Sequence, residues 1–67
     1  MAEDEIRTNA QELIEAGVNI THIWVELMAR GGNGSVADLK GFLDGVAPAD
    51  ELYSMILAVT LKELRHL

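Results

Sequence analysis

The side chains that could perform chemistry in this chain are a few aliphatic hydroxyls and two histidines. They are Thr8, Thr21, Ser35, Ser54 and Thr60, together with His22 and His66. Nucleophilic catalysis needs a hydroxyl, a base and an orienting group held within hydrogen-bond reach. No spacing in the sequence brings such a set together, so we expect no catalytic residues and no enzymatic activity.

Metal and cofactor sites are also not indicated. The chain has no cysteine, which removes disulfides and the usual structural zinc sites. His22 and His66 stand far apart and have no companions at ligand spacing. We therefore expect no metal and no cofactor.

The segment Gly31-Gly32-Asn33-Gly34 is the clearest break in the sequence. Glycine-rich loops can cradle phosphates at the start of a helix. This one lacks the lysine of the GxxxxGK[ST] pattern and the GxGxxG spacing, and no strand precedes it. The segment is therefore predicted to be a turn between two helices.

A second interpretation of the same loop is an attachment site for a prosthetic arm. The run Gly31-Gly32-Asn33-Gly34-Ser35-Val36 resembles the GG-x-S-[LI] signature of peptidyl carrier proteins, which hold such an arm on the serine. The run departs from the signature by one extra residue before the serine. The resemblance implies an acyl- or peptidyl-carrier-like protein as one alternative function.

A third interpretation is DNA binding through a helix-turn-helix made from the helices expected near residues 19–30 and 36–45. A recognition helix needs basic or amide side chains that face the groove. The candidates are only Lys40, Lys62 and Arg65, within a chain of formal net charge −6. This charge disfavours nucleic acid and anionic membranes as partners.

Hydrophobic periodicity predicts four helices and no strand. The first follows the stripe Ile6, Ala10, Leu13 and Ile14 and ends near Gly17. The second runs to about Arg30, capped by Asn19 or Thr21, with its stripe at Ile20, Ile23, Trp24, Leu27 and Met28.

The third helix is short, from about Val36 to Asp44, with Ser35 as its N-cap and Asp38 completing a capping box. We expect Val36, Leu39, Phe42 and Leu43 to point inward. Gly41 within this helix suggests that another helix approaches closely there. Pro48 suits the linker to the last helix, which we expect to begin at Asp50.

The last helix, over residues 50–67, is apolar on more than one side. One stripe runs Leu52, Ile56, Val59, and another runs Tyr53, Leu57, Thr60, Leu64, Leu67. A helix that is apolar around most of its circumference must be covered on more than one side. We therefore expect one face to line the core and one to meet a partner. The predicted contact residues are Trp24, Tyr53, Leu57, Leu61 and Leu64.

The length and charge of the chain bear on its oligomeric state and on its class of function. A chain of 67 residues, taken as one helical domain over residues 1–67 with residues 1–4 frayed, is near the lower limit for folding alone. We predict an all-α bundle of four helices completed by homodimerisation. With no secretory signal, transmembrane run or basic surface, the sequence favours a small acidic, cytoplasmic protein–protein interaction module. Such a regulator would act as a homodimer, and a larger protein with a basic surface is a further candidate partner.

Overall fold

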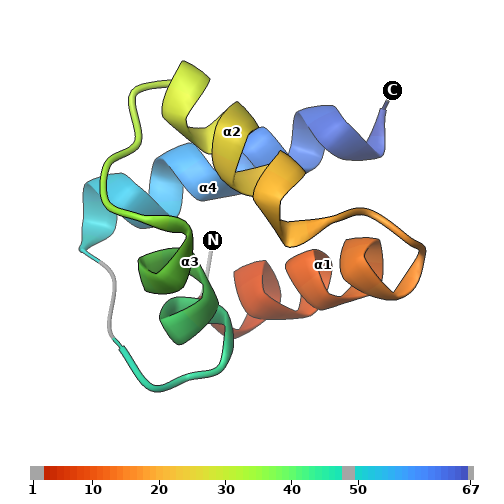
Figure 1. The fold of residues 1–67 in the computed structure, drawn as a ribbon, viewed down its shortest axis with the longest axis horizontal. Coiled ribbons are helices and arrows are strands. Elements are labelled where there is room, and N and C mark those ends of the chain that lie inside the picture. The colour runs from red at the N-terminus through yellow and green to blue at the C-terminus, as the bar shows by residue number, and fades with distance from the viewer. Residues whose placement is uncertain (1–2, 48–49, 67) are drawn as a thin grey trace.

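The structure is a computed structural model that describes residues 3–47 and 50–66, and these residues form a small helical bundle (Figure 1). The helices are α1 (Glu3–Glu15), α2 (Ile20–Ala29), α3 (Val36–Leu43) and α4 (Glu51–Arg65). No strand occurs in the described part of the chain. The prediction of an all-α fold with four helices, the third one short, is confirmed.

The helix boundaries agree with the predicted ones within about two residues. Arg30 and Asp44, expected inside the second and third helices, are the C-caps of α2 and α3. The helix α1 begins at Glu3, so two of the four residues expected to be frayed are helical. Pro48 and Leu67 lie outside the described residues.

The helix starts are fixed by the local side chains that the sequence indicated. Asn19 Oδ1 accepts a hydrogen bond from the Thr21 amide at 2.8 Å, and Asp50 Oδ1 accepts one from the Tyr53 amide at 2.7 Å. Ser35 and Asp38 form the complete capping box. Each of these bonds satisfies an amide that has no partner within its own helix.

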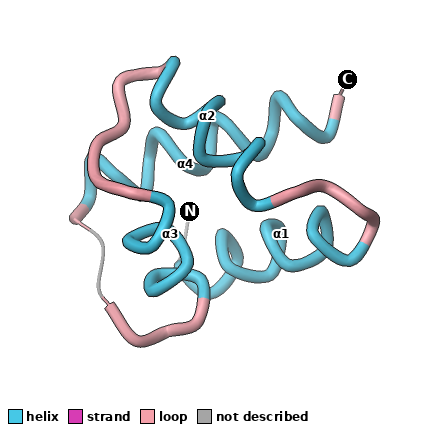
Figure 2. The backbone as a smooth tube through the Cα atoms, in the orientation of Figure 1, coloured by secondary structure: helices cyan, strands magenta, loops and turns pink. Residues whose placement is uncertain are grey.

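The helices pack in pairs around one core (Figure 2). The helix α4 packs against both α1 and α2, and α3 packs against the same two helices from another side. Loops join the helices, and the one at residues 30–35 turns the chain from α2 into α3. The fully buried apolar residues are Ile6, Ala10, Ile23, Leu27, Leu39, Phe42, Leu43, Leu57 and Leu61.

Two expectations for α3 are wrong. Val36 was expected to point inward but is 36% exposed, because the loop residues 33–35 and the first turn of α3 all lie at the surface. Gly41 was expected to mark the close approach of another helix. Within the described residues, the nearest atom to a Cβ built there is Ala47 Cβ at 3.6 Å, in the segment that follows α3.

Side chains of α1 hold the end of α3. Arg7 Nε donates to the Phe42 carbonyl at 2.8 Å, and its guanidinium lies 4.6 Å from the centre of the Phe42 ring. Gln11 Nε2 donates to the Leu43 carbonyl at 3.5 Å. The last carbonyls of a helix have no partner within it, and a cation there also complements the helix dipole. The end of α3 is thus stabilised from a helix more than thirty residues earlier in the chain.

Candidate interaction surface

The outer face of α4 carries a row of large apolar side chains in contact with solvent. Leu52 is 65% exposed, Met55 59% and Val59 51%. They follow one another at spacings of three and four residues, and the exposed residues Lys62 and His66 continue the same spacing. We call Leu52, Met55, Val59, Lys62 and His66 the α4 seam. Alternating spacings of three and four place side chains on one line along a helix, as in coiled coils.

The inner face of the same helix holds most of the contact residues predicted from the sequence. Leu57 and Leu61 are fully buried in the core, and Tyr53 and Leu64 are partly buried and pack against it. The fifth, Trp24, comes from α2, packs against the core, and donates from Nε1 to the Gly34 carbonyl at 3.3 Å. The contact role of these residues stays a prediction, while the apolar side chains that α4 presents to solvent are others.

Sequence reasoning placed Leu52, Ile56 and Val59 on one stripe of this helix and chose the contact residues on α4 mainly from the other stripe. The structure keeps Leu52 and Val59 outside, but Ile56 is partly buried against the core and Met55 takes its place. Helical spacing fits both Leu52, Met55, Val59 and Leu52, Ile56, Val59, so the sequence alone does not decide between Met55 and Ile56. The packing of α4 against α1 and α2 decides it.

Two shallow hollows flank Val59. One is lined by Ile6 of α1 and, on α4, by Glu51, Ser54, Met55, Ala58 and Val59. The other is lined by Arg30 of α2 and, on α4, by Val59, Lys62, Glu63 and His66. Surface relief of this kind, with an apolar side chain between depressions, suits the interlocking of side chains from a second helix.

Charges are divided along α4. Asp50 and Glu51 stand at its start, and Lys62 and Arg65 in its last turn, in keeping with the helix dipole. The acid in that turn, Glu63, is paired with Arg30. Arg65 Nη1 donates to Asn9 Oδ1 at 2.8 Å. Within the described residues Lys62 makes no ion pair. The end of the α4 seam therefore presents an ammonium group that is open to an external acid.

The arginines are engaged within the chain. Arg30 bonds the Glu26 carboxylate at 2.9 Å, confirming the predicted pair, and also bonds Glu63 of α4. The hydrogen bonds that the Arg30 guanidinium donates to Glu26 and Glu63 raise the pKa of Arg30 above its ordinary value. Arg7 binds the end of α3 and Arg65 binds Asn9. Groove recognition needs extended, unengaged basic side chains, and these three are already held.

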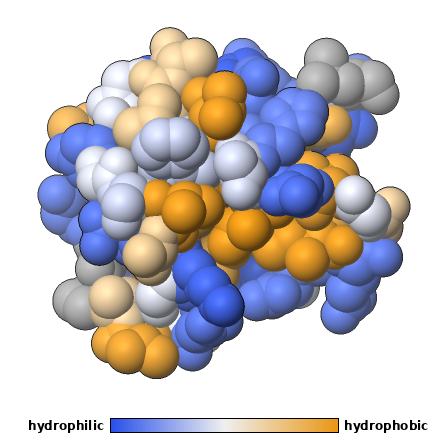
Figure 3. Space-filling model, viewed as in Figure 1, coloured by the Kyte–Doolittle hydropathy of each residue, from blue (hydrophilic) through white to orange (hydrophobic). Residues whose placement is uncertain are grey.

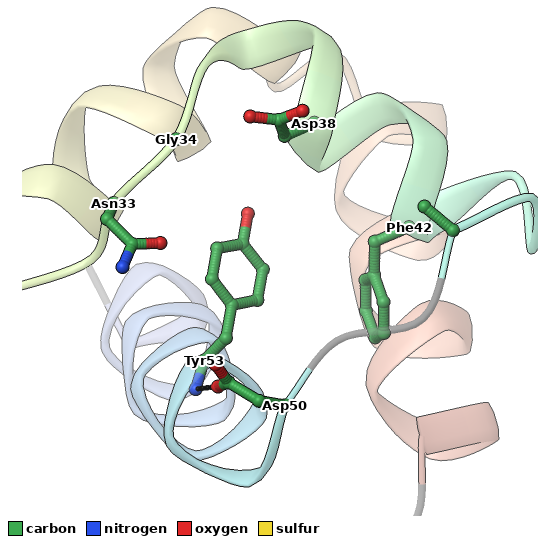
Figure 4. Close-up of a pocket in the computed structure, with 7 residues that line it drawn as sticks. Asn33, Gly34, Asp38, Phe42, Asp50 and Tyr53 are labelled. Carbon is green, nitrogen blue, oxygen red and sulfur yellow. Dashed lines mark hydrogen bonds between the residues drawn. The ribbon is translucent and has the colours of Figure 1, made fainter.

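A cleft of about 220 Å³ opens beside Tyr53 at the start of α4 (Figure 4). The Tyr53 ring meets the Phe42 ring edge-on, with centroids 6.2 Å apart. Its hydroxyl points into the space near Asp38 and Asn33, is buried, and has no hydrogen-bond partner among the described residues. Burial first, and the negative charge of Asp38 second, raise the pKa of Tyr53.

Replacing Tyr53 by phenylalanine is expected to leave stability at pH 7 unchanged or to raise it by up to about 1 kcal/mol, because a buried hydroxyl without a partner among the described residues is removed. Tyr53 is the only tyrosine, so the rise in absorbance near 295 nm that accompanies phenol ionisation reports this group alone. Because the folded pKa is raised, the neutral hydroxyl favours folding below the unfolded pKa near ~10, and this contribution is lost as pH rises through the folded pKa. Alkaline unfolding should therefore shift to higher pH in Tyr53→Phe. An unchanged alkaline transition would contradict the assignment.

A second apolar area lies between α1 and α2. In the view of Figure 3, where α4 lies behind α2, apolar side chains gather between α1 and α2. Half-buried residues of these helices, among them Leu13, Ile14 and Ile20, pack against the core. They are more deeply covered than Leu52, Met55 and Val59, so the α4 seam is the stronger candidate for a contact surface.

Comparison with known proteins does not assign the chain to a family. The chain matches no family model, and no curated protein or solved structure is significantly similar to it. No helix in the described residues has the length and apolar character needed to cross a membrane.

Ser35 is the residue that a carrier protein would modify. Its hydroxyl oxygen accepts a hydrogen bond from the Asp38 amide at 3.2 Å.

Proposed function

We propose that the protein is a protein–protein interaction module that associates with itself through the α4 seam and acts as a homodimeric regulator. The observation that carries the proposal is the row of Leu52, Met55 and Val59, each more than half exposed on a single helix face. Single exposed apolar residues are common, but a contiguous row bordered by charged groups is typical of an association surface.

The size of the chain supports the same conclusion. A domain of 67 residues has a small core, and burial of further apolar surface against a second copy adds to its stability. Six aliphatic side chains, three from each copy, would leave water in a two-fold arrangement. A contact of this size is at the small end for specific interfaces, so the dimer is expected to be in exchange with the monomer.

The acidic charge supports a regulatory role toward a larger, basic partner. The formal net charge is −6, and Glu5, Glu12 and Glu15 are exposed on α1. A field of one sign accelerates encounter with a surface of the other sign and suppresses wrong partners. A homodimer would present this acidic surface twice.

The test is the mass of the particle in solution, measured by light scattering after size-exclusion chromatography at roughly 100 µM, a concentration suited to a small interface. We expect a dimer that dissociates on dilution. Val59→Lys is expected to abolish it, because a charge would be buried in the contact.

The matched control is Val25→Lys. Val25 is 49% exposed on α2 and Val59 51% exposed on α4, so the two variants make the same change at sites of equal exposure. Val25→Lys should keep the dimer. A monomeric wild-type chain, or equal effects of the two substitutions, would overturn the proposal.

A further inference from the structure

We infer that the two copies pair through antiparallel α4 helices, with Met55 of each copy facing Val59 of the other and the ammonium group of each Lys62 reaching Glu51 of the other. This inference rests on the proposed self-association and adds its geometry. It follows from three features of the α4 seam: its spacing, its charges and its register.

The spacing of the seam is that of a helix pair. Its residues follow at intervals of three, four, three and four, and all five are exposed. Such a line of positions stays on one side of a helix over several turns and meets the same line of a second helix. The seam extends from the first turn of α4 to its C-cap, so almost the whole helix can take part.

The charges decide the direction. In a parallel pair, each Glu51 would lie beside the other Glu51 and each Lys62 beside the other Lys62, which is repulsive at both ends. In an antiparallel pair, each Glu51 lies near Lys62 of the other copy, and the two helix dipoles also oppose each other favourably. Lys62 has no ion pair within the described residues, so it can form this contact without losing another.

The register follows from keeping apolar groups together. With the two-fold axis beside Leu57, Met55 faces Val59 twice and Leu52 faces the aliphatic part of Lys62, whose ammonium reaches Glu51. Long basic side chains commonly cover apolar surface in this way. If the two-fold axis instead lay at Val59, so that the two Val59 side chains faced each other, Met55 would lie opposite Glu63 and Leu52 opposite His66. This register separates the apolar side chains and takes Lys62 away from Glu51.

Cysteine cross-linking tests the geometry directly, because the chain contains no cysteine of its own. The two variants are Met55→Cys and Val59→Cys, each at an exposed position where substitution leaves the core intact. A disulfide requires Cα atoms within roughly 7 Å. Each variant alone, and then an equal mixture, is oxidised with oxidised glutathione, and the products are identified by intact mass.

In the antiparallel pair, residues 55 and 59 of different copies are adjacent, and each residue is displaced from its own counterpart. The mixture should therefore give mainly the mixed Met55→Cys/Val59→Cys disulfide, and each variant alone should give little. A parallel pair would give strong homodisulfides from each variant alone, which would overturn the inference. Val25→Cys serves as the control, because residue 25 lies outside the α4 seam. It should give only the small amount of disulfide-linked dimer that random collision produces.

The outcomes separate this inference from the proposed function. A wild-type dimer whose variants form homodisulfides, or no disulfide above the Val25→Cys level, refutes the pairing and leaves self-association standing. A wild-type monomer at the same concentration refutes both.

Discussion

Replacing Leu57 by alanine is expected to lower the free energy of unfolding by about 3 kcal/mol, the usual cost of a cavity at a fully buried leucine. Leu57 is 0% exposed and lies where α4 faces the core. A single core of this size supplies only roughly 3–5 kcal/mol of net stability. The variant should therefore be largely unfolded at physiological temperature, as seen by the loss of helical circular dichroism.

Leu52→Ala is the matched control, with the same substitution five residues away on the same helix. Leu52 is 65% exposed, so its truncation should change stability by at most about 0.5 kcal/mol. Urea denaturation of both variants at low micromolar concentration, where association does not contribute, provides the comparison. Equal losses at the two positions would show that α4 does not have the inner and outer faces described above.

Replacing Gly32 by alanine is expected to cost about 1–3 kcal/mol, because the new methyl group has no space. A Cβ at Gly32 would lie 2.7 Å from Leu27 Cγ and 2.9 Å from the Leu27 carbonyl oxygen. Leu27 is fully buried, and its carbonyl also accepts the Gly32 amide at 3.0 Å. Neither atom can move without disturbing the core or the turn after α2.

The control is Gly41→Ala within α3. Among the residues that the structure describes, a Cβ there would meet only Ala47 Cβ, in an ordinary contact at 3.6 Å. Alanine in a helix interior is favoured over glycine, so this variant should gain roughly 0.5–1 kcal/mol. Thermal unfolding of the two variants should therefore shift in opposite directions. A gain in stability for Gly32→Ala would refute the close contact with Leu27.

The parts of the fold that depend on neighbouring residues were predictable from the sequence. Helix starts at Asn19, Ser35 and Asp50 depend on side chains that bond amides two or three residues later, and all three are present. Hydrophobic spacing likewise predicted the burial of Ile6 and Ala10 on α1. Such local signals are complete within one or two turns of helix.

The orientation of α4 could not be predicted with the same accuracy. Leu57 and Met55 are both apolar, and only the positions of α1 and α2 decide that the first is buried and the second exposed. The bond from Arg7 to the Phe42 carbonyl joins residues 35 apart, which no periodicity records. For the candidate surface, the sequence indicated the same helix that carries the exposed apolar row but selected mainly side chains of its inner face.

The contacts of Arg7 and Gln11 with the end of α3 have a consequence for how the chain folds. An eight-residue helix is too short to persist by itself in water. The last carbonyls of α3 accept from side chains of α1 in addition to the local amide of Gly45, which bonds the Phe42 carbonyl at 3.0 Å. The first and third helices should therefore open and close as one cooperative unit, although the second helix separates them in the sequence. The helix α3 would then become stable only when residues 3–15 dock against it. A contact between distant parts of the sequence would therefore form early in folding.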